Sequence, residues 1–190
     1  MVPVALAADP VAVGAVIGAL ALVLFAAAWH KLAEPEVFAG ALQAYDLLPT
    51  GAVLGVARAL PVLEVAIGIG VLVPITRQPA LIALAVLLAV YAAAIAINLG
   101  RGRRQIDCGC GGDAHPLSWG LVVRNAVLAA AALAVSGPTL QRGFEWLDGV
   151  TLVVGLLAFY ALYLMFDELL RQSSRLGELR AHDHREVEAK

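Results

Sequence analysis

The sequence predicts an all-α membrane protein, a polytopic helix bundle, and three observations support this fold class. Hydrophobic residues make up 61% of the 190 residues and charged residues only 15%, whereas soluble domains are roughly half apolar and roughly a quarter charged. The mean hydropathy is +0.85. The apolar residues also gather in five windows. This composition excludes a disordered chain, a nucleic-acid-binding protein and a water-soluble enzyme of ordinary composition.

The five windows are the expected membrane spans, because a spanning helix needs about 20 mostly apolar residues. They cover residues 11–29, 52–73, 79–99, 117–135 and 149–166. None of them alternates apolar and polar residues as the strands of an outer-membrane barrel do. Since backbone groups in lipid must find hydrogen bonds within their own segment, helices are expected. Residues 1–166 are therefore predicted to form one membrane domain.

The first window is expected to be a retained helix rather than a signal peptide. Residues 1–10 carry a single charge, the negative Asp9, and lack the positive residues that precede a signal sequence. Two pairs of glycines spaced four residues apart are interpreted as places where helices approach closely. These pairs are Gly14 with Gly18 and Gly51 with Gly55.

The polar segment of residues 167–190 is predicted to be a partly amphipathic helix on the membrane surface, because leucines recur at 169, 170, 176 and 179. With five spans, this tail shares a membrane face with the connections after the first and third spans. That face carries most of the cations near the spans, namely Lys31, Arg101, Arg103, Arg104, Arg171, Arg175 and Arg180. The positive-inside rule places it in the cytoplasm.

The strongest local motif is the run DCGCGG at residues 107–112, which contains both cysteines of the chain. Cys108 and Cys110 flank Gly109, whose backbone freedom is needed to close so small a disulfide ring. Strained disulfides exchange faster than relaxed ones. The nearby arginines favour the thiolate, while Asp107 opposes it. A redox-active cysteine pair is the leading interpretation.

Two other interpretations of this segment stay open. Cys108, Cys110, His115 and either Asp107 or Asp113 have the donor types of a metal site, although their spacing is irregular for zinc. In the second alternative, the run is a glycine-rich turn whose thiols have no chemical role.

Ionisable residues inside the windows form a second candidate site, because a charge in the membrane is costly unless it is paired. Glu64 lies near the middle of the second window and Arg124, next to Asn125, lies in the fourth. We expect Glu64 and Arg124 to face each other, with Arg58 as the second candidate partner of Glu64. A purely structural alternative is that such a pair only sets the register of the helices.

Several motifs resemble those of the MauE family of methylamine utilisation membrane proteins, which is related to the DoxX family. They are AWHKLAEPEVF at 28–38, YDLLP at 45–49, LPVLE at 60–64 followed by Gly68, RGR at 101–103, DCGCGG at 107–112, and LSW at 117–119 followed by Arg124 and Asn125. The resemblance covers roughly residues 11–135. The fifth span and the tail are additions, and Gly111 is followed by Gly112 where a bulky residue before the glycine is common in relatives.

The resemblance implies a four-helix core in a bacterial inner membrane. It also implies a role in maturing or oxidising disulfide-bearing proteins, usually with a thioredoxin-like partner. Relatives of this type are compared with a quinone-linked thiol oxidoreductase, so a membrane quinone is the candidate cofactor, although no residue demonstrates one.

We therefore hypothesise a membrane thiol–disulfide protein in which Cys108 and Cys110 exchange electrons with a client protein. Glu64, Arg124 and Asn125 are expected to form a polar floor beneath the cysteine segment, closed by His30 and Lys31 from the first helix. The alternatives are a metal or small-solute transporter and an assembly partner without chemistry of its own. Transport is disfavoured because only one half of the bundle carries ionisable residues.

Overall fold

The computed structural model describes residues 9–103, 105, 106, 116–139, 143 and 145–188, with side chains of the last helix described to residue 169 and at 172. Six α-helices make up this part of the chain, which confirms the all-α prediction. In order they are α1 (Pro10–Ala33), α2 (Pro35–Ala44), α3 (Thr50–Leu72), α4 (Arg77–Gly100), α5 (Trp119–Ala134) and α6 (Trp146–Glu188).

Four segments are long and apolar enough to cross a membrane: α1, α3, α4 and residues 146–169 of α6. They correspond to four of the five predicted windows, so the chain is a multi-pass membrane protein. The remaining window forms α5, which has 16 residues. Such a helix is about 24 Å long, against a hydrocarbon core of about 30 Å. A full crossing by α5 stays a prediction.

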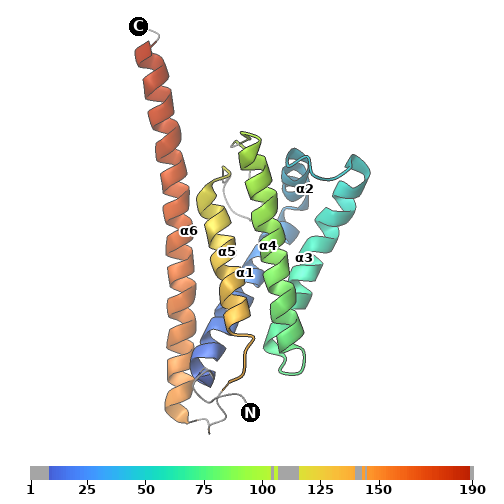
Figure 1. Cartoon of the computed structure of the whole chain (residues 1–190), viewed down its shortest axis with the longest axis vertical. Helices are drawn as coiled ribbons and strands as arrows, with labels where there is room; N and C mark the ends of the chain where they lie inside the picture. Colours follow the sequence, from blue (N-terminus) through green and yellow to red (C-terminus); the bar gives the residue numbers. More distant parts are fainter. Residues whose placement is uncertain (1–8, 104, 107–115, 140–142, 144, 189–190) are drawn as a thin grey trace.

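The helices run up and down, so that several connections meet at one end of the bundle (Figure 1). This end carries α2, the end of α4 and the start of α5, and we call it the α2 end. Helix α6 also runs toward it and continues beyond it as a straight helix (Figure 1). Residues 167–188 are thus helical, as predicted for the tail, and they continue α6 without a break. Their position on the membrane surface stays a prediction.

Local sequence explains where α1 and α2 begin. The Asp9 carboxylate accepts a hydrogen bond from the Val11 N–H at 2.8 Å and caps α1. Pro10 and Pro35 stand in the first turns of α1 and α2, where a missing N–H costs nothing. Because the residue before a proline avoids the helical region, Glu34 separates the two helices. The chain can therefore turn and lay α2 across the end of the bundle.

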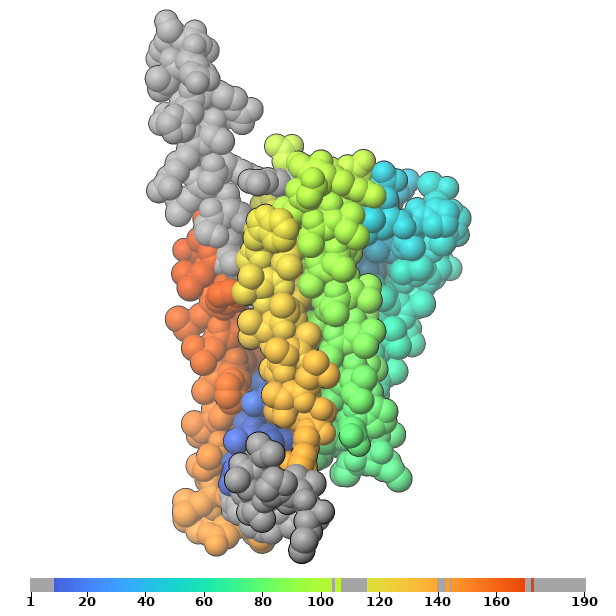
Figure 2. All heavy atoms as spheres, viewed as in Figure 1, coloured from blue at the N-terminus to red at the C-terminus, as the bar shows by residue number. Residues whose placement is uncertain are grey.

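The main hydrophobic core joins α1, α3, α4 and α5, with Val71, Leu81 and Leu84 almost fully buried in it. Helices α4 and α5 pack along each other (Figure 2). A second, smaller core lies toward the α2 end. It contains Tyr45, Ile95, Leu99, Leu117 and Leu121, with Ile106 packed against it.

The glycine pairs behave differently from each other. A Cβ on Gly14 or Gly18 would lie 3.0 or 2.9 Å from leucines of α6, so this pair lets α6 approach α1 as predicted. A Cβ on Gly51 or Gly55 would meet nothing within 4 Å, so the close approach predicted there is wrong. The tightest position is Gly68 of α3, where a Cβ would lie 2.5 Å from the Phe25 ring of α1.

Replacing Gly68 by leucine is expected to force α1 and α3 apart. Overpacking typically costs about 1–3 kcal/mol, and each kcal/mol lowers the melting temperature by about 2–4 °C for a chain of this size. Gly55→Leu, in the same helix but with open space around it, is the matched control. Thermal unfolding in one detergent compares the two. Equal melting temperatures for both variants would contradict the packing described.

Candidate functional site

A buried cluster of charged and hydroxyl groups joins three helices. The Lys31 ammonium of α1 donates a hydrogen bond to Oε1 of Glu64 in α3, at 2.6 Å. The Tyr91 hydroxyl of α4 donates to the same oxygen, also at 2.6 Å. The Lys31 side chain is 5% exposed and that of Glu64 is 0% exposed. We call these three residues the Lys31–Glu64–Tyr91 cluster.

Aromatic rings complete the surroundings of the ammonium group. Its Nζ lies 5.5 Å from the ring centroids of both Phe38, in α2, and Tyr91. A cation held over an aromatic face gains energy when water is excluded. Lys31 therefore combines an ion pair with two ring contacts. Oε2 of Glu64 is buried and has no hydrogen-bond partner among the described residues.

The predicted pairing of Glu64 with Arg124 is wrong. Arg124 instead forms an ion pair with Asp167 of α6, and its guanidinium lies 5.8 Å from the Tyr163 ring centroid. Arg58 is not the partner of Glu64 either, because its side chain is exposed on α3. The physical reason is that the long Lys31 side chain reaches Glu64 from the end of α1, while α6 continues past residue 166 and presents a carboxylate to Arg124.

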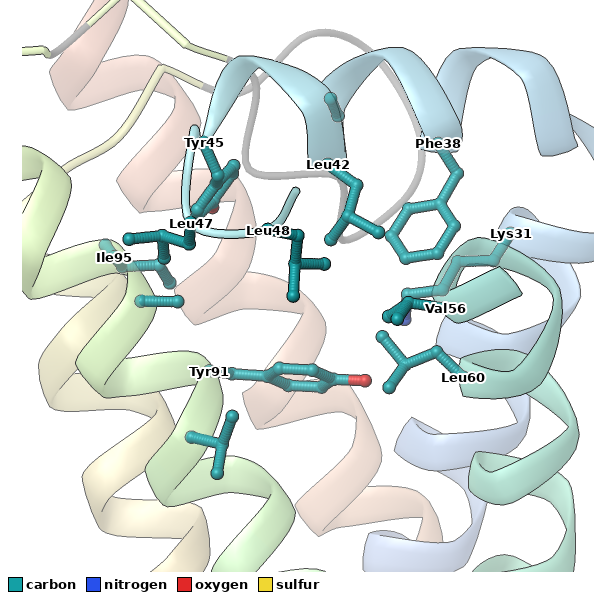
Figure 3. Close-up of a pocket in the computed structure, with 13 residues that line it drawn as sticks. Lys31, Phe38, Leu42, Tyr45, Leu47, Leu48, Val56, Leu60, Tyr91 and Ile95 are labelled. Atoms are coloured by element: carbon teal, nitrogen blue, oxygen red, sulfur yellow. The ribbon is translucent and has the colours of Figure 1, made fainter. Parts of the chain in front are cut away.

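An apolar cavity of about 240 Å³ lies directly above the cluster, between α2, α3 and α4. Figure 3 shows side chains of α2 on one side of it and the Tyr91 ring across the opposite side. We call it the α3–α4 cavity. Its lining is apolar apart from Lys31, Tyr45 and Tyr91, and the other members are Phe38, Ala41, Leu42, Leu47, Leu48, Val56, Leu60, Val90, Ala94 and Ile95.

Lys31 also lines a second hollow. This groove runs between α2 and α3 and carries the polar side chains of Glu36, Gln43 and Arg58, all three of them exposed. Lys31 is therefore shared by the α3–α4 cavity and a groove with several polar side chains at the α2 end.

The predicted cysteine pair lies outside the described residues, as do Asp107 and the other members of the alternative metal set, Asp113 and His115. The residues on either side of this segment are described. Ile106 and Leu117 pack in the smaller core with Tyr45 and Ile95, which also line the α3–α4 cavity. Within the described part of the chain, no group of three or more His, Cys, Asp or Glu could hold a metal ion.

Arg101 and Arg103, at the end of α4, contact the turn after α2. Arg103 forms an ion pair with Asp46 at 3.2 Å, and an Arg101 N–H donates to the Asp46 carbonyl oxygen at 3.3 Å. Asp46 has a positive φ of 52°, an arrangement that aspartate tolerates better than most residues. The end of α4 is thus held next to α2.

The other predicted site residues divide between buried and exposed positions. Asn125 is buried in α5, with an Nδ2 that has no partner in the described part of the chain. His30 is exposed and lies outside the cluster. Tyr91, Tyr163 and Asp167 were not predicted as site residues from the sequence. The sequence did offer signals for them: each tyrosine places a hydroxyl group inside an apolar window, and Asp167 places a carboxylate directly after one.

Comparisons with known proteins agree with the motifs. The family model described as methylamine utilisation protein MauE matches residues 9–137, more than half of the chain. The chain is 50% identical over 119 residues to a methylamine utilization protein MauE of Paracoccus denitrificans, covering 62% of this chain and 64% of the relative. A MauE protein of Paracoccus versutus is 40% identical over 151 residues, 77% of this chain and 79% of the relative.

A third relative, from Methylorubrum extorquens, carries the same name and is 41% identical over 134 residues, 70% of this chain and 72% of the relative. The matched part of this chain thus spans less than two thirds of the Paracoccus denitrificans protein and more of the other two. No solved structure matches the chain.

The ion pair of the cluster predicts a specific pattern of stabilities. Lys31→Met leaves the Glu64 carboxylate buried without its cation, which typically costs about 3–5 kcal/mol. Adding Glu64→Gln removes the orphaned charge and is expected to recover most of the loss. Arg58→Met makes the same replacement at an exposed position and is expected to change little. Thermal unfolding measures all four proteins, and equal effects of Lys31→Met and Arg58→Met would refute the pairing.

Proposed function

Because the chain belongs to the MauE family, we propose that it serves methylamine utilisation as a membrane thiol–disulfide protein. In this proposal Cys108 and Cys110 exchange electrons with the cysteines of a client or of a thioredoxin-like partner. The membrane is the bacterial inner membrane. The positive-inside rule predicts that the α2 end, with Lys31, Arg101 and Arg103, faces the cytoplasm.

The observation that carries the proposal is the setting of the cysteine segment. Both cysteines of the chain fall within three consecutive positions. The segment is bounded by Ile106 and Leu117, which share one small core with Tyr45. These two residues lie at the α2 end, and Tyr45 and Ile95 of the same core also line the α3–α4 cavity. Cysteines that served packing alone would have no reason to lie two positions apart in a glycine-rich run.

The chemistry is ordinary thiol–disulfide exchange. A client thiolate attacks one sulfur of the Cys108–Cys110 disulfide, and the other sulfur leaves as a thiolate and takes up a proton. The second client thiol then attacks the mixed disulfide. The client loses two electrons and two protons and gains a disulfide, while Cys108 and Cys110 become two thiols. The same steps run backward if the partner is the oxidant.

Single cysteine variants test this proposal. Replacing the resolving cysteine by serine, either Cys108→Ser or Cys110→Ser, is expected to trap a mixed disulfide with the partner, because the thiol that would release it is gone. The trapped species is detected in host membranes as a reductant-sensitive band of higher mass on a non-reducing gel. The Cys108→Ser/Cys110→Ser double variant is the control and is expected to give no such band.

A second measurement separates this chemistry from metal binding. Purified protein is titrated in dithiothreitol buffers of graded potential, and its thiols and metal content are measured. The proposal predicts one reversible two-electron transition in protein without metal. Stoichiometric zinc that protects both thiols would overturn it, because cysteines that bind a metal as thiolates are not available for disulfide exchange. Full support of methylamine growth by the double serine variant would also overturn it.

A further inference from the structure

We infer that the groove between α2 and α3 binds one phospholipid of the surrounding membrane by its phosphoethanolamine head group. This is the hollow that Lys31 lines together with Glu36, Gln43 and Arg58, and we call it the α2–α3 groove. Its volume of about 680 Å³ falls within the range of about 300–1,000 Å³ that ligand pockets occupy. The site consists only of described residues and is independent of the thiol–disulfide proposal.

Small residues keep the α2–α3 groove open. Ala39 and Gly40 of α2 and Ala57 of α3 line it, and a Cβ on Gly40 would meet nothing within 4 Å. The two helices contact each other and lie side by side at the α2 end (Figure 1). A molecule in the groove would therefore touch both helices at once.

The groove carries two opposite charges that have no ion-pair partner among the described residues. Arg58 stands on α3 and Glu36 on α2, and both side chains are exposed. The ion pairs in the described part of the chain involve other side chains. Lys31 also lines the groove, but its charge is balanced by Glu64. The unbalanced charges therefore fit a ligand that carries one anionic and one cationic group.

The depth of Arg58 indicates where the anionic group comes from. This residue lies eight positions after Thr50, the first residue of α3, which is about 12 Å along the helix axis. An unpaired guanidinium group inside a membrane-spanning helix is costly, and its long side chain reaches toward the lipid head groups. The anion present at that level is the lipid phosphate, whose oxygens match the fork of N–H groups on arginine.

Two acceptors in the groove select the cationic group. The Glu36 carboxylate is one of them. The Ala57 carbonyl oxygen is the other, because Pro61 has no N–H and leaves it without its regular partner in the helix, and both residues line the groove. A primary ammonium group offers three N–H donors to such acceptors. The trimethylammonium group of phosphocholine offers none, and a phosphoglycerol head group has no positive charge, so phosphoethanolamine fits best.

The surface of α3 beyond the groove fits the acyl chains of the same molecule. Val62 and Ile69 lie four and eleven residues after Arg58, which places the three side chains on one face of the helix. The valine is 61% exposed and the isoleucine 53%, so this face presents an apolar surface to lipid. Its continuity with the groove favours a phospholipid over a soluble molecule with the same head group.

Native mass spectrometry tests the binding directly. The full-length protein is purified and freed of lipid in detergent, and its melting temperature is measured first to confirm that it is folded. It is then mixed with dioleoyl phosphatidylethanolamine, and the bound molecules are counted. One molecule per chain is expected, bound roughly fivefold more tightly than dioleoyl phosphatidylcholine or phosphatidylglycerol, because neither of these supplies an ammonium donor.

Charge variants identify the two ends of the head group. Arg58→Gln is expected to weaken phosphatidylethanolamine binding roughly tenfold, since it removes the charge-assisted hydrogen bonds to the phosphate. Glu36→Gln is expected to reduce the preference for phosphatidylethanolamine over phosphatidylcholine. Glu34→Gln makes the same replacement at an exposed position that does not line the groove, and it is expected to leave that preference unchanged.

A pair of glycine variants tests the place of binding. Gly40→Trp fills the groove and is expected to abolish lipid binding. Gly55→Trp adds the same side chain to α3, where a Cβ also meets nothing within 4 Å and the residue does not line the groove, and it is expected to bind like the native protein. Equal binding by these two variants, or equal binding of the three lipids, would overturn the inference. A dimer that Gly40→Trp abolishes would also overturn it, because a second copy would then fill the groove.

Discussion

The ion pair between Lys31 and Glu64 is the interaction on which the α2 end of this bundle depends. A carboxylate with no exposed surface in the middle of a membrane helix is tolerated only with a partner. Lys31 supplies the charge, and Tyr91 supplies a second hydrogen bond to the same oxygen. Because the three groups come from α1, α3 and α4, the cluster holds these helices in one arrangement at this depth.

The position of α2 follows from the same pair. Lys31 stands in the last turn of α1, and Pro35 opens α2 two residues after α1 ends. The ring of Phe38 then lies over the ammonium group, so the short helix covers the charge from above. The space left between α2 and the Tyr91 ring is the α3–α4 cavity. The smaller core around Tyr45 joins this cavity to the two residues that bound the cysteine segment.

The helical architecture could be predicted from the sequence, because membrane spans are encoded in short apolar windows. All five windows correspond to helices, and the burial of Glu64 and Arg124 was predicted from the cost of a charge in lipid. The partners of these charges could not be predicted. The partner of each charge depends on which helices pack side by side in three dimensions. A short stretch of sequence does not contain that information.

Particular residues show how the partners were missed. Lys31 was expected only to close the site from the end of its helix, where lysine usually extends toward water, yet it folds inward to Glu64. Tyr91 was treated as part of an apolar window, although its hydroxyl needs a partner when buried. Asp167 was excluded because the last window ended at residue 166, one residue short of the partner of Arg124.

The most direct test is a distance measurement between Lys31 and Glu64 in a lipid bilayer. Solid-state NMR dipolar recoupling between ¹⁵N at the lysine Nζ and ¹³C at the glutamate carboxyl suits this chain, because Lys31 and Lys190 are its only lysines. The account predicts strong dephasing of the Lys31 signal, as expected for a direct hydrogen bond, and its loss in the Glu64→Gln protein. A Lys31 signal without dephasing, or unchanged dephasing in the Glu64→Gln protein, would contradict it.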